Sequence, residues 1–207
     1  MIKTRHLFLV FIPAIAVVSF ALFVRIVQYE PVYDRNKPLD IPRQMAQLFP
    51  EDPILGNKKS PITLVAFEDF SCPACSTQSK MLDDILLQYP NSIKIIWKSI
   101  STHKSELANN YAYCANKQRK FAEFKNLAFA NQNNLNIDIL NIISETIELN
   151  ETKLNKCLAS GEAEIYNQKN RDLATILHVQ AVPTFFLNDV QLQTPKSRDE
   201  WKNVLGL

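Results

Sequence analysis

The residues of this chain best suited to chemistry are Cys72 and Cys75, in the segment Cys72–Pro73–Ala74–Cys75. Two thiols at this spacing can form a reversible disulfide. A strand-like apolar run precedes them and a run of helical periodicity follows, so Cys72 is expected at a helix N-terminus. The free N–H groups and the positive dipole end there stabilise a thiolate, the reactive form of cysteine. We therefore predict a redox site, with Cys72 as nucleophile and Cys75 as resolving thiol.

The two residues between the cysteines are expected to tune this pair. Pro73 suits the first helical position, because its missing N–H would have no partner there. Neither Pro73 nor Ala74 brings a charge or a side-chain donor to the sulfur. Stabilisation of the Cys72 thiolate must then come from the helix terminus itself.

Three other interpretations of the pair are a zinc site, a purely structural disulfide and two buried thiols. Zinc usually takes four ligands, and the remaining cysteines and histidines form no second close pair. A bridge across two residues closes too short a loop to gain much stability. We expect no metal and no cofactor beyond the redox-active disulfide.

The composition of the chain argues against two classes of function, nucleic-acid binding and nucleotide binding. The 23 basic and 21 acidic residues give a net charge of +2 without a basic block, which argues against nucleic acid as a partner. Only three glycines are present, too few for a glycine-rich phosphate loop. The 46% hydrophobic content is enough for one packed domain.

Residues 1–27 are predicted to be a signal or membrane anchor. Lys3 and Arg5 precede an uncharged run from Leu7 to Val24. This run is short for a bilayer span and long for a signal core, and Ala14–Ile15–Ala16 offers a cleavage site. Cleavage and retention both remain open, and we favour retention with the N-terminus in the inner membrane. The rest of the chain would then lie in the periplasm or another extracytoplasmic space, where disulfides persist.

Residues 28–54 are polar and proline-rich, and predict a tether before a domain over 55–207. Ile62–Phe67 predicts a buried strand, Pro73–Tyr89 a helix and Ile93–Trp97 a second strand. This order indicates a parallel, right-handed βαβ unit.

The remainder of the domain predicts helices followed by a hairpin. From about 104 to 178, apolar residues recur with helical period and no strand pattern occurs. Thr184–Leu187 and Val190–Gln193 flank the turn signal Asn188–Asp189, which predicts a β-hairpin. Ser197–Leu205 predicts a final helix with Ser197 as its N-cap.

Together these segments resemble a known family. The stretch Gly56–Cys75, the helical block and Val182–Pro183–Thr184–Phe185–Phe186–Leu187–Asn188 resemble the DsbA-type thiol:disulfide oxidoreductases over about residues 52–207. The resemblance implies an α/β thioredoxin fold, with βαβ and ββα halves and a helical domain inserted between them. It also implies that Pro183 is a cis-proline beside the cysteines, in a substrate groove shaped by Val182 and Thr184. Valine at position 182 is typical of the oxidising members, whereas isomerases commonly carry threonine there.

The same resemblance implies the function. The chain would introduce disulfides into unfolded or newly exported polypeptides through Cys72 and Cys75, and a DsbB-type membrane protein would reoxidise it. A disulfide isomerase or reductase is the nearest alternative, because reduction potential decides the direction of exchange. A membrane-anchored binding or chaperone module with a structural bridge is the alternative from another class.

Two positions depart from the family pattern. The family's buried acid, which assists proton transfer to the resolving thiol, stands six residues before the first cysteine, where this chain has Ala66. Glu68 shares the strand face of Ala66, and is either a substitute acid or a solvated strand-end charge. Asp69 is either a cap near the active-site helix or a surface turn residue. His178 replaces a family glycine at a helix end, which costs up to about 1 kcal/mol if the cap is left-handed.

Cys114 and Cys157 both lie in the predicted helical block. An even remaining pair in an oxidising compartment favours a structural disulfide. Two buried free thiols and a second redox relay are the alternatives.

Overall fold

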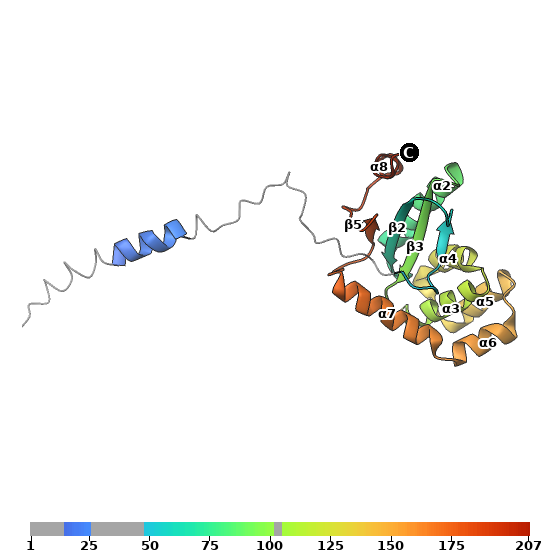
Figure 1. Ribbon diagram of the computed structural model, residues 1–207. Helices are drawn as coiled ribbons and strands as arrows, with labels where there is room; N and C mark the ends of the chain where they lie inside the picture. The colour runs from blue at the N-terminus through green and yellow to red at the C-terminus, as the bar shows by residue number, and fades with distance from the viewer. Residues whose placement is uncertain (1–14, 26–47, 102–104) are drawn as a thin grey trace, which may run out of the picture. The chain divides into compact units, whose positions relative to one another are not determined.

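The computed structural model describes residues 15–25, 48–101 and 105–207, in two units, Met1–Asp40 and Ile41–Leu207 (Figure 1). In the first unit, residues 15–25 form a helix. Most of the predicted anchor over 1–27, and residues 28–47 of the predicted tether over 28–54, lie outside the described residues. Within the described ranges, no helix combines the length and apolar character needed to cross a membrane.

A five-stranded sheet forms the centre of the second unit, in the order β1-β3-β2-β4-β5. Its strands are β1 (Ile54–Gly56), β2 (Ile62–Glu68), β3 (Ile93–Ser99), β4 (Thr184–Leu187) and β5 (Val190–Gln191). β2 and β3 are parallel and the other neighbouring pairs are antiparallel. With helix α2 (Pro73–Gln88) between them, β2 and β3 form the predicted βαβ unit. β4 and β5 form the predicted hairpin, although β5 ends two residues early.

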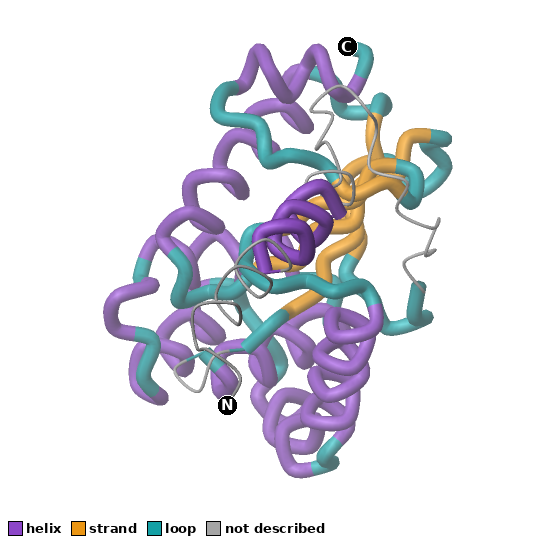
Figure 2. Tube along the Cα trace, turned by 90° about the vertical axis from the view of Figure 1, so that its left-hand side faces the viewer, coloured by secondary structure: helices purple, strands orange, loops and turns teal. Residues whose placement is uncertain are grey.

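Helices pack on both faces of the sheet, as the tube view also shows (Figure 2). Alternation along β2 explains this, because Leu64 and Ala66 face one side while Val65 and Phe67 face the other. The first side packs against α2 and the C-terminal helix α8 (Arg198–Leu205), whose Trp201 is fully buried. The second side packs against α7 (Glu162–Ile176). Ser197 caps α8 as predicted, by accepting the Glu200 N–H at 3.2 Å.

The segment between β3 and β4 is helical, which confirms the predicted insertion. It contains α3 (Glu106–Lys117), α4 (Phe121–Ala130), a 3-10 turn (Gln132–Asn134), α5 (Ile137–Thr146), α6 (Glu151–Ala159) and α7. In Figure 1, α3, α5, α6 and α7 gather beyond one end of the sheet. A disulfide joins Cys114 of α3 to Cys157 of α6, with their Cα atoms 5.8 Å apart.

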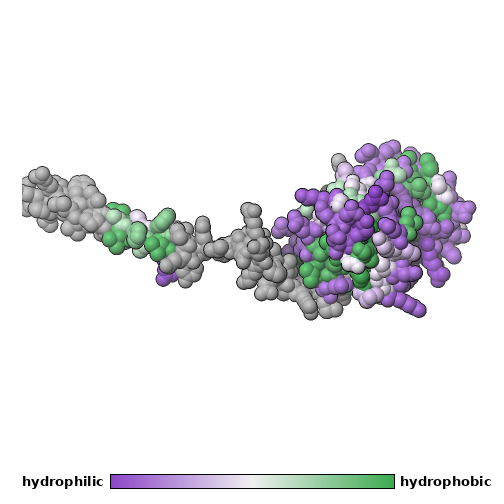
Figure 3. Space-filling view, turned by 90° about the horizontal axis from the view of Figure 1, so that it is seen from above, coloured by the Kyte–Doolittle hydropathy of each residue, from purple (hydrophilic) through white to green (hydrophobic). Residues whose placement is uncertain are grey.

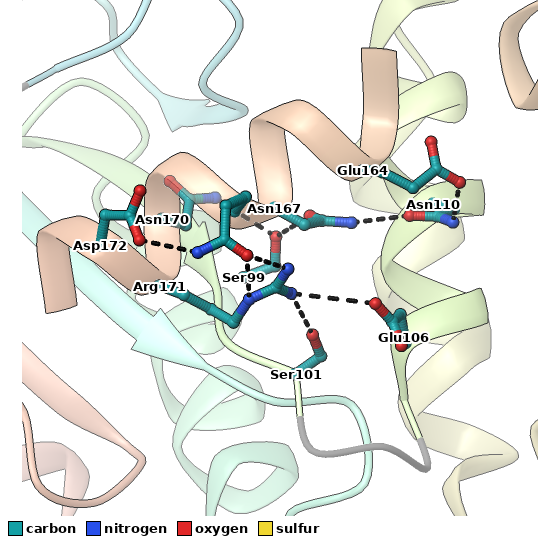
Figure 4. A network of polar contacts seen from close by, with 10 residues as sticks. Ser99, Ser101, Glu106, Asn110, Glu164, Asn167, Asn170, Arg171 and Asp172 are labelled. Carbon is teal, nitrogen blue, oxygen red and sulfur yellow. Dashed lines mark hydrogen bonds and ion pairs between the residues drawn. The ribbon is translucent and has the colours of Figure 1, made fainter. Parts of the chain in front are cut away.

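A polar network fastens this insert to the end of β3 (Figure 4). The Ser99 hydroxyl donates to the Asn167 side chain at 3.1 Å, and Asn167 donates to Asn110 at 2.7 Å. Asn110 in turn donates to Glu164 at 2.7 Å. Since Asn110 lies on α3 and Asn167 on α7, these bonds fix two helices of the insert to the same strand end.

The folded unit begins earlier than the predicted boundary at residue 55. Asp52 is buried and accepts hydrogen bonds from Lys98 at 2.6 Å, the Phe49 N–H at 2.7 Å and the Tyr166 hydroxyl at 2.9 Å. The Lys98 ammonium also lies 3.7 Å from the centre of the Phe49 ring. Partners so distant in sequence leave no local pattern, and proline content alone suggested a tether through residue 54.

Helix α7 ends in a left-handed cap at His178, where the family glycine was missing. His178 has φ 55°, and the following Val179 N–H donates to the Ala174 carbonyl at 2.8 Å. This is the Schellman arrangement, in which glycine is the preferred residue at the left-handed position. The inference that a histidine here makes the helix end differently is therefore wrong, because His178 adopts the left-handed cap itself.

Replacing His178 by glycine is expected to stabilise the protein by about 0.5–1 kcal/mol, because glycine adopts this conformation without steric strain. Urea denaturation of the two proteins measures the difference. His178→Ala is the matched control and should bring no such gain. An unchanged midpoint for His178→Gly would show that the cap is not strained.

Candidate active site

Cys72 occupies the N-cap position of α2. Its sulfur accepts the backbone N–H of Cys75 at 3.2 Å, and Pro73 opens the helix. Cys72 is partly exposed, Pro73 and Ala74 are exposed, and Cys75 is completely buried. Both cysteines are free thiols in this structure. The arrangement gives one accessible sulfur at a helix N-terminus and one protected sulfur behind it.

The environment of Cys75 disfavours its thiolate. Burial is the largest cause that raises the pKa of the Cys75 thiol, and the hydrogen bond with Cys72 raises it further. The backbone of Asp69 acts in the opposite direction. Cys75 is therefore a thiol at neutral pH, and as a leaving group it needs a proton.

The chain returns to this site at Val182–Pro183, a cis peptide bond, as the resemblance implies. The Cys72 thiol donates to the Val182 carbonyl at 3.6 Å. Thr184 begins β4 directly afterwards, and its hydroxyl donates to the Ala181 carbonyl at 2.7 Å. The structure thus brings the Val182 carbonyl beside the Cys72 sulfur from 110 residues away, and Pro183 and Thr184 follow it directly in the chain.

Glu68, at the end of β2, is a buried acid. Its side chain is 1% exposed, and neither carboxylate oxygen has a hydrogen-bond partner among the described residues. Burial raises the pKa of Glu68 to about 8, while the charge of Lys125 lowers it and that of Asp83 raises it. Glu68 is close enough to Cys75 for its charge to raise the pKa of that thiol. The alternative of a solvated strand-end charge is therefore wrong, and Glu68 is a mainly protonated carboxyl at neutral pH.

Asp69 shapes the turn into the active-site helix. It is buried, and its carboxylate accepts the Ser71 N–H at 2.7 Å and the Ser71 hydroxyl at 2.8 Å. Its backbone carbonyl accepts the Cys72 N–H at 3.0 Å. Asp69 is therefore not a surface residue, and its carboxylate caps a backbone N–H in the turn that leads into α2, whose N-cap residue is Cys72.

Comparisons with protein families and with solved structures agree with the fold and the cysteine site described above. A family model described as thioredoxin matches residues 49–206. The chain belongs to the thioredoxin family. Among solved structures, alpha-DsbA1 of Wolbachia pipientis has a TM-score of 0.69 at 20% identity, covering 79% of this chain and 94% of that one. BdbD of Bacillus subtilis has a TM-score of 0.67 at 21% identity, covering 75% and 91%. These likenesses confirm the predicted thioredoxin fold of DsbA type.

A search of curated proteins finds a different kind of relative. The Na(+)/H(+) antiporter NhaA 3 of Salinispora tropica is 26% identical over 163 residues, which are 77% of this chain and 24% of the antiporter. NhaA 1 of Salinispora arenicola matches over the same shares at 26% identity. This thioredoxin-family chain thus spans about a quarter of the length of the curated relatives it matches.

Sequence reasoning missed one charged group beneath the thioredoxin-type cysteine pair. Lys125 on α4 is 1% exposed, and its ammonium lies 2.7 Å from Asp83 and 2.6 Å from the Ser79 hydroxyl. Helical periodicity placed position 125 on a helix but gave no sign that a lysine there points inward. Across the described residues, no three histidine, cysteine or acidic side chains are grouped as for a metal ion.

Proposed function

We propose that this protein is a thiol:disulfide oxidoreductase that passes a Cys72–Cys75 disulfide to unfolded or newly exported polypeptides. The observation that carries the proposal is the position of the Cys72 sulfur. It is partly exposed at the N-terminus of α2, 3.6 Å from the Val182 carbonyl, with Cys75 buried behind it. Exchange needs one sulfur that a substrate can reach and a second that solvent thiols cannot.

The geometry supports the following sequence of steps. A substrate thiolate attacks the Cys72 sulfur of the oxidised protein, the Cys72–Cys75 bond breaks, and Glu68 gives its proton to the departing Cys75 sulfur. A second substrate thiolate then attacks the mixed disulfide and releases Cys72 as a thiolate, which the helix N-terminus stabilises. Two electrons pass from the substrate to the protein. No metal or organic cofactor takes part.

Residues around Cys72 provide the place for the substrate. Pro73 and Ala74 are exposed beside the sulfur, and the backbone edge at Val182 and Pro183 lies across from it, with the Val182 carbonyl 3.6 Å from the sulfur. An extended peptide carrying the reacting cysteine would lie along that edge, with Thr184 supporting it from β4.

The cellular setting is part of the same proposal. Residues 15–25 carry exposed apolar side chains, among them Ile15, Phe20 and Phe23 (Figure 3). An apolar segment beside Lys3 and Arg5 would hold the N-terminus in the inner membrane and leave the thioredoxin-family domain in the periplasm. A DsbB-type membrane protein would reoxidise the cysteine pair there. Antiport is not proposed, since the chain spans only about a quarter of the relatives named for it.

Equilibration with glutathione, followed by alkylation and mass spectrometry, tests the proposal. An oxidase should have a potential well above the roughly −270 mV of thioredoxin. A value close to about −270 mV would favour the reductase alternative. A value below about −300 mV would mark an inert bridge and exclude the redox function. The Cys114→Ala/Cys157→Ala double variant is the control and should report the same potential.

A further inference from the structure

A groove opens on the surface between α2 and the start of α8, which lie side by side (Figure 1). The residues that line it include Ser76, Thr77 and Lys80 on one wall and Lys196, Ser197 and Arg198 on the other. Gln78 holds the two walls together, because its side chain donates to the Pro195 carbonyl at 2.8 Å and accepts the Trp201 indole N–H at 2.7 Å. All three of these residues are buried, so this α2–α8 groove is a fixed feature of the surface.

The α2–α8 groove begins beside the reactive sulfur. Ser76 and Lys80 follow Cys72 by four and eight residues, and positions at this spacing share one face of a helix. The Ser76 N–H donates to the Cys72 carbonyl at 3.1 Å, which places the first lining residue one helical turn from the sulfur. The Thr194 hydroxyl donates to the Pro183 carbonyl at 3.4 Å, and this bond ties the opposite wall to the backbone edge beside Cys72. A polypeptide that reacts at Cys72 can therefore continue along the groove.

The charge of the α2–α8 groove is positive. Asp84, the one acidic residue of the described lining, lies 3.2 Å from Arg198 in an ion pair. Lys80 and Lys196 are exposed, and neither forms an ion pair with a described residue. The Glu200 carboxylate accepts the backbone N–H of Lys196 at 2.7 Å and lies outside the lining. Two ammonium groups thus line the groove without a carboxylate partner.

Helix geometry sets how far a partner carboxylate must lie from the reacting cysteine of a substrate. At a rise of about 1.5 Å per residue, Lys80 lies roughly 12 Å along α2 from Cys72. An extended peptide covers this distance in about four residues, at roughly 3.3 Å each. A carboxylate at that separation would reach the ammonium groups while the cysteine contacts the sulfur of Cys72.

We propose that the α2–α8 groove selects polypeptides that carry acidic side chains about four residues from the reacting cysteine, and that Lys80 and Lys196 bind those side chains. The inference rests on the proposed function, in which an exported polypeptide reacts at Cys72. Charges that meet across a hydrated surface mainly raise the rate of encounter. Lys80 and Lys196 therefore determine which substrate reacts fastest, and they take no part in the exchange between sulfur atoms.

The test measures how fast the oxidised full chain oxidises three dithiol peptides of equal length. The peptides differ only in two residues placed about four positions from the cysteines, which are both glutamate, both glutamine or both lysine. Each rate is divided by the rate of the same peptide with hydroxyethyl disulfide, a neutral compound, which corrects for differences in thiol ionisation. At about 20 mM salt the glutamate peptide should react about three- to tenfold faster than the lysine peptide, and the ratio should approach one at about 500 mM salt.

Variants of the two lysines identify the source of the preference. Lys80→Gln/Lys196→Gln should abolish it, and Lys80→Glu/Lys196→Glu should reverse it in favour of the lysine peptide. Both positions are exposed, so these variants should fold. Lys58→Gln/Lys59→Gln is the matched control, because it removes two exposed lysines before β2, at the opposite end of that strand from Cys72, and should keep the preference. Reduction by dithiothreitol, a small thiol that does not span the groove, should stay near the parent rate in every variant.

The outcomes separate this inference from the proposed function. A parent protein that oxidises the glutamate peptide no faster than the lysine peptide would overturn the inference alone. The same holds for a preference that survives in Lys80→Gln/Lys196→Gln or at about 500 mM salt, because charge in the groove would not be its cause. A parent protein that oxidises none of the three peptides would overturn the proposed function, and this inference with it.

Discussion

The free energy of unfolding of the parent protein is expected to fall between about pH 4.5 and pH 8, and the Glu68→Gln variant should show little of this fall. In the parent, burial raises the pKa of Glu68 from 4.5 in the unfolded chain to about 8 in the folded one. Glutamine has nearly the same shape and does not ionise. The variant should therefore be the relatively more stable protein at pH 8, by an amount that shrinks as the pH is lowered.

The sign follows from which state binds the proton more tightly. Below pH 4.5 the carboxyl is protonated in both states, and it contributes no pH dependence. Between pH 4.5 and 8 the unfolded chain loses its proton and the folded chain keeps it, so stability falls by about 1.4 kcal/mol per pH unit. Above pH 8 both states are ionised and the loss is complete. With the values for Glu68, it amounts to at most about 5 kcal/mol.

Urea denaturation of parent and variant at pH 4.5, 6, 7 and 8, with the cysteines reduced, measures this difference. Any constant effect of the buried amide cancels when the difference is compared across pH. Glu145→Gln, which changes an exposed acid on α5, is the matched control. Parallel curves for parent and Glu68→Gln would mean that Glu68 ionises near its ordinary range, and would remove it as a proton donor.

Sequence was sufficient for the parts of this fold that obey local rules. Apolar runs, turn residues and caps predicted β2, α2, β3, the hairpin and α8, because each depends on residues within a few positions of one another. The helical insert was predicted from the helical spacing of its apolar residues. β1 was missed because three residues are too few to show a strand pattern, and Gly56 ends it in a left-handed conformation with φ 77°.

The residues of the active site also fall into two groups, those that the sequence predicted and those whose surroundings depend on distant elements. Cys72, Cys75 and Val182–Pro183 were found from residue type, spacing and resemblance. The alternatives for Glu68 stayed open because burial at a strand end depends on what packs above it. In this chain α4, more than 50 residues downstream, packs its Phe124 against Phe70, just beyond that end, and brings Lys125 into the interior. A charge placed by a distant element has no signature in the sequence around the cysteines.

Lys98→Met, which removes one partner of the buried Lys98–Asp52 pair, is expected to lower the free energy of unfolding by about 3–5 kcal/mol. Both groups are buried, and burial is the largest cause that raises the pKa of Asp52 and lowers that of Lys98. Each charge is therefore tolerated because of the other. Of the donors to Asp52 in the described part of the chain, removing Lys98 leaves the Phe49 N–H and the Tyr166 hydroxyl.

The loss should also depend on pH, in a direction that identifies its cause. Without Lys98, whose charge lowers it, the pKa of folded Asp52 rises further above its unfolded value of 3.8. The folded variant then favours the protonated form of Asp52. Its free energy of unfolding is therefore highest below about pH 4 and falls as the pH rises. Lys98→Met should consequently be more destabilised at pH 7.5 than at pH 4.5, relative to the parent protein.

The double variant Lys98→Met/Asp52→Asn separates charge from packing. It removes both buried charges, keeps the volume of Asp52, and is expected to recover most of the stability with little dependence on pH, since a buried ion pair can be replaced without net loss. Urea denaturation of the parent, both single variants and the double variant completes the cycle. Equal losses for Lys98→Met at both pH values, with no recovery in the double variant, would assign its effect to contact with the Phe49 ring. Recovery would show that the pair adds little to net stability and that the loss in Lys98→Met comes from the unpaired Asp52 carboxylate.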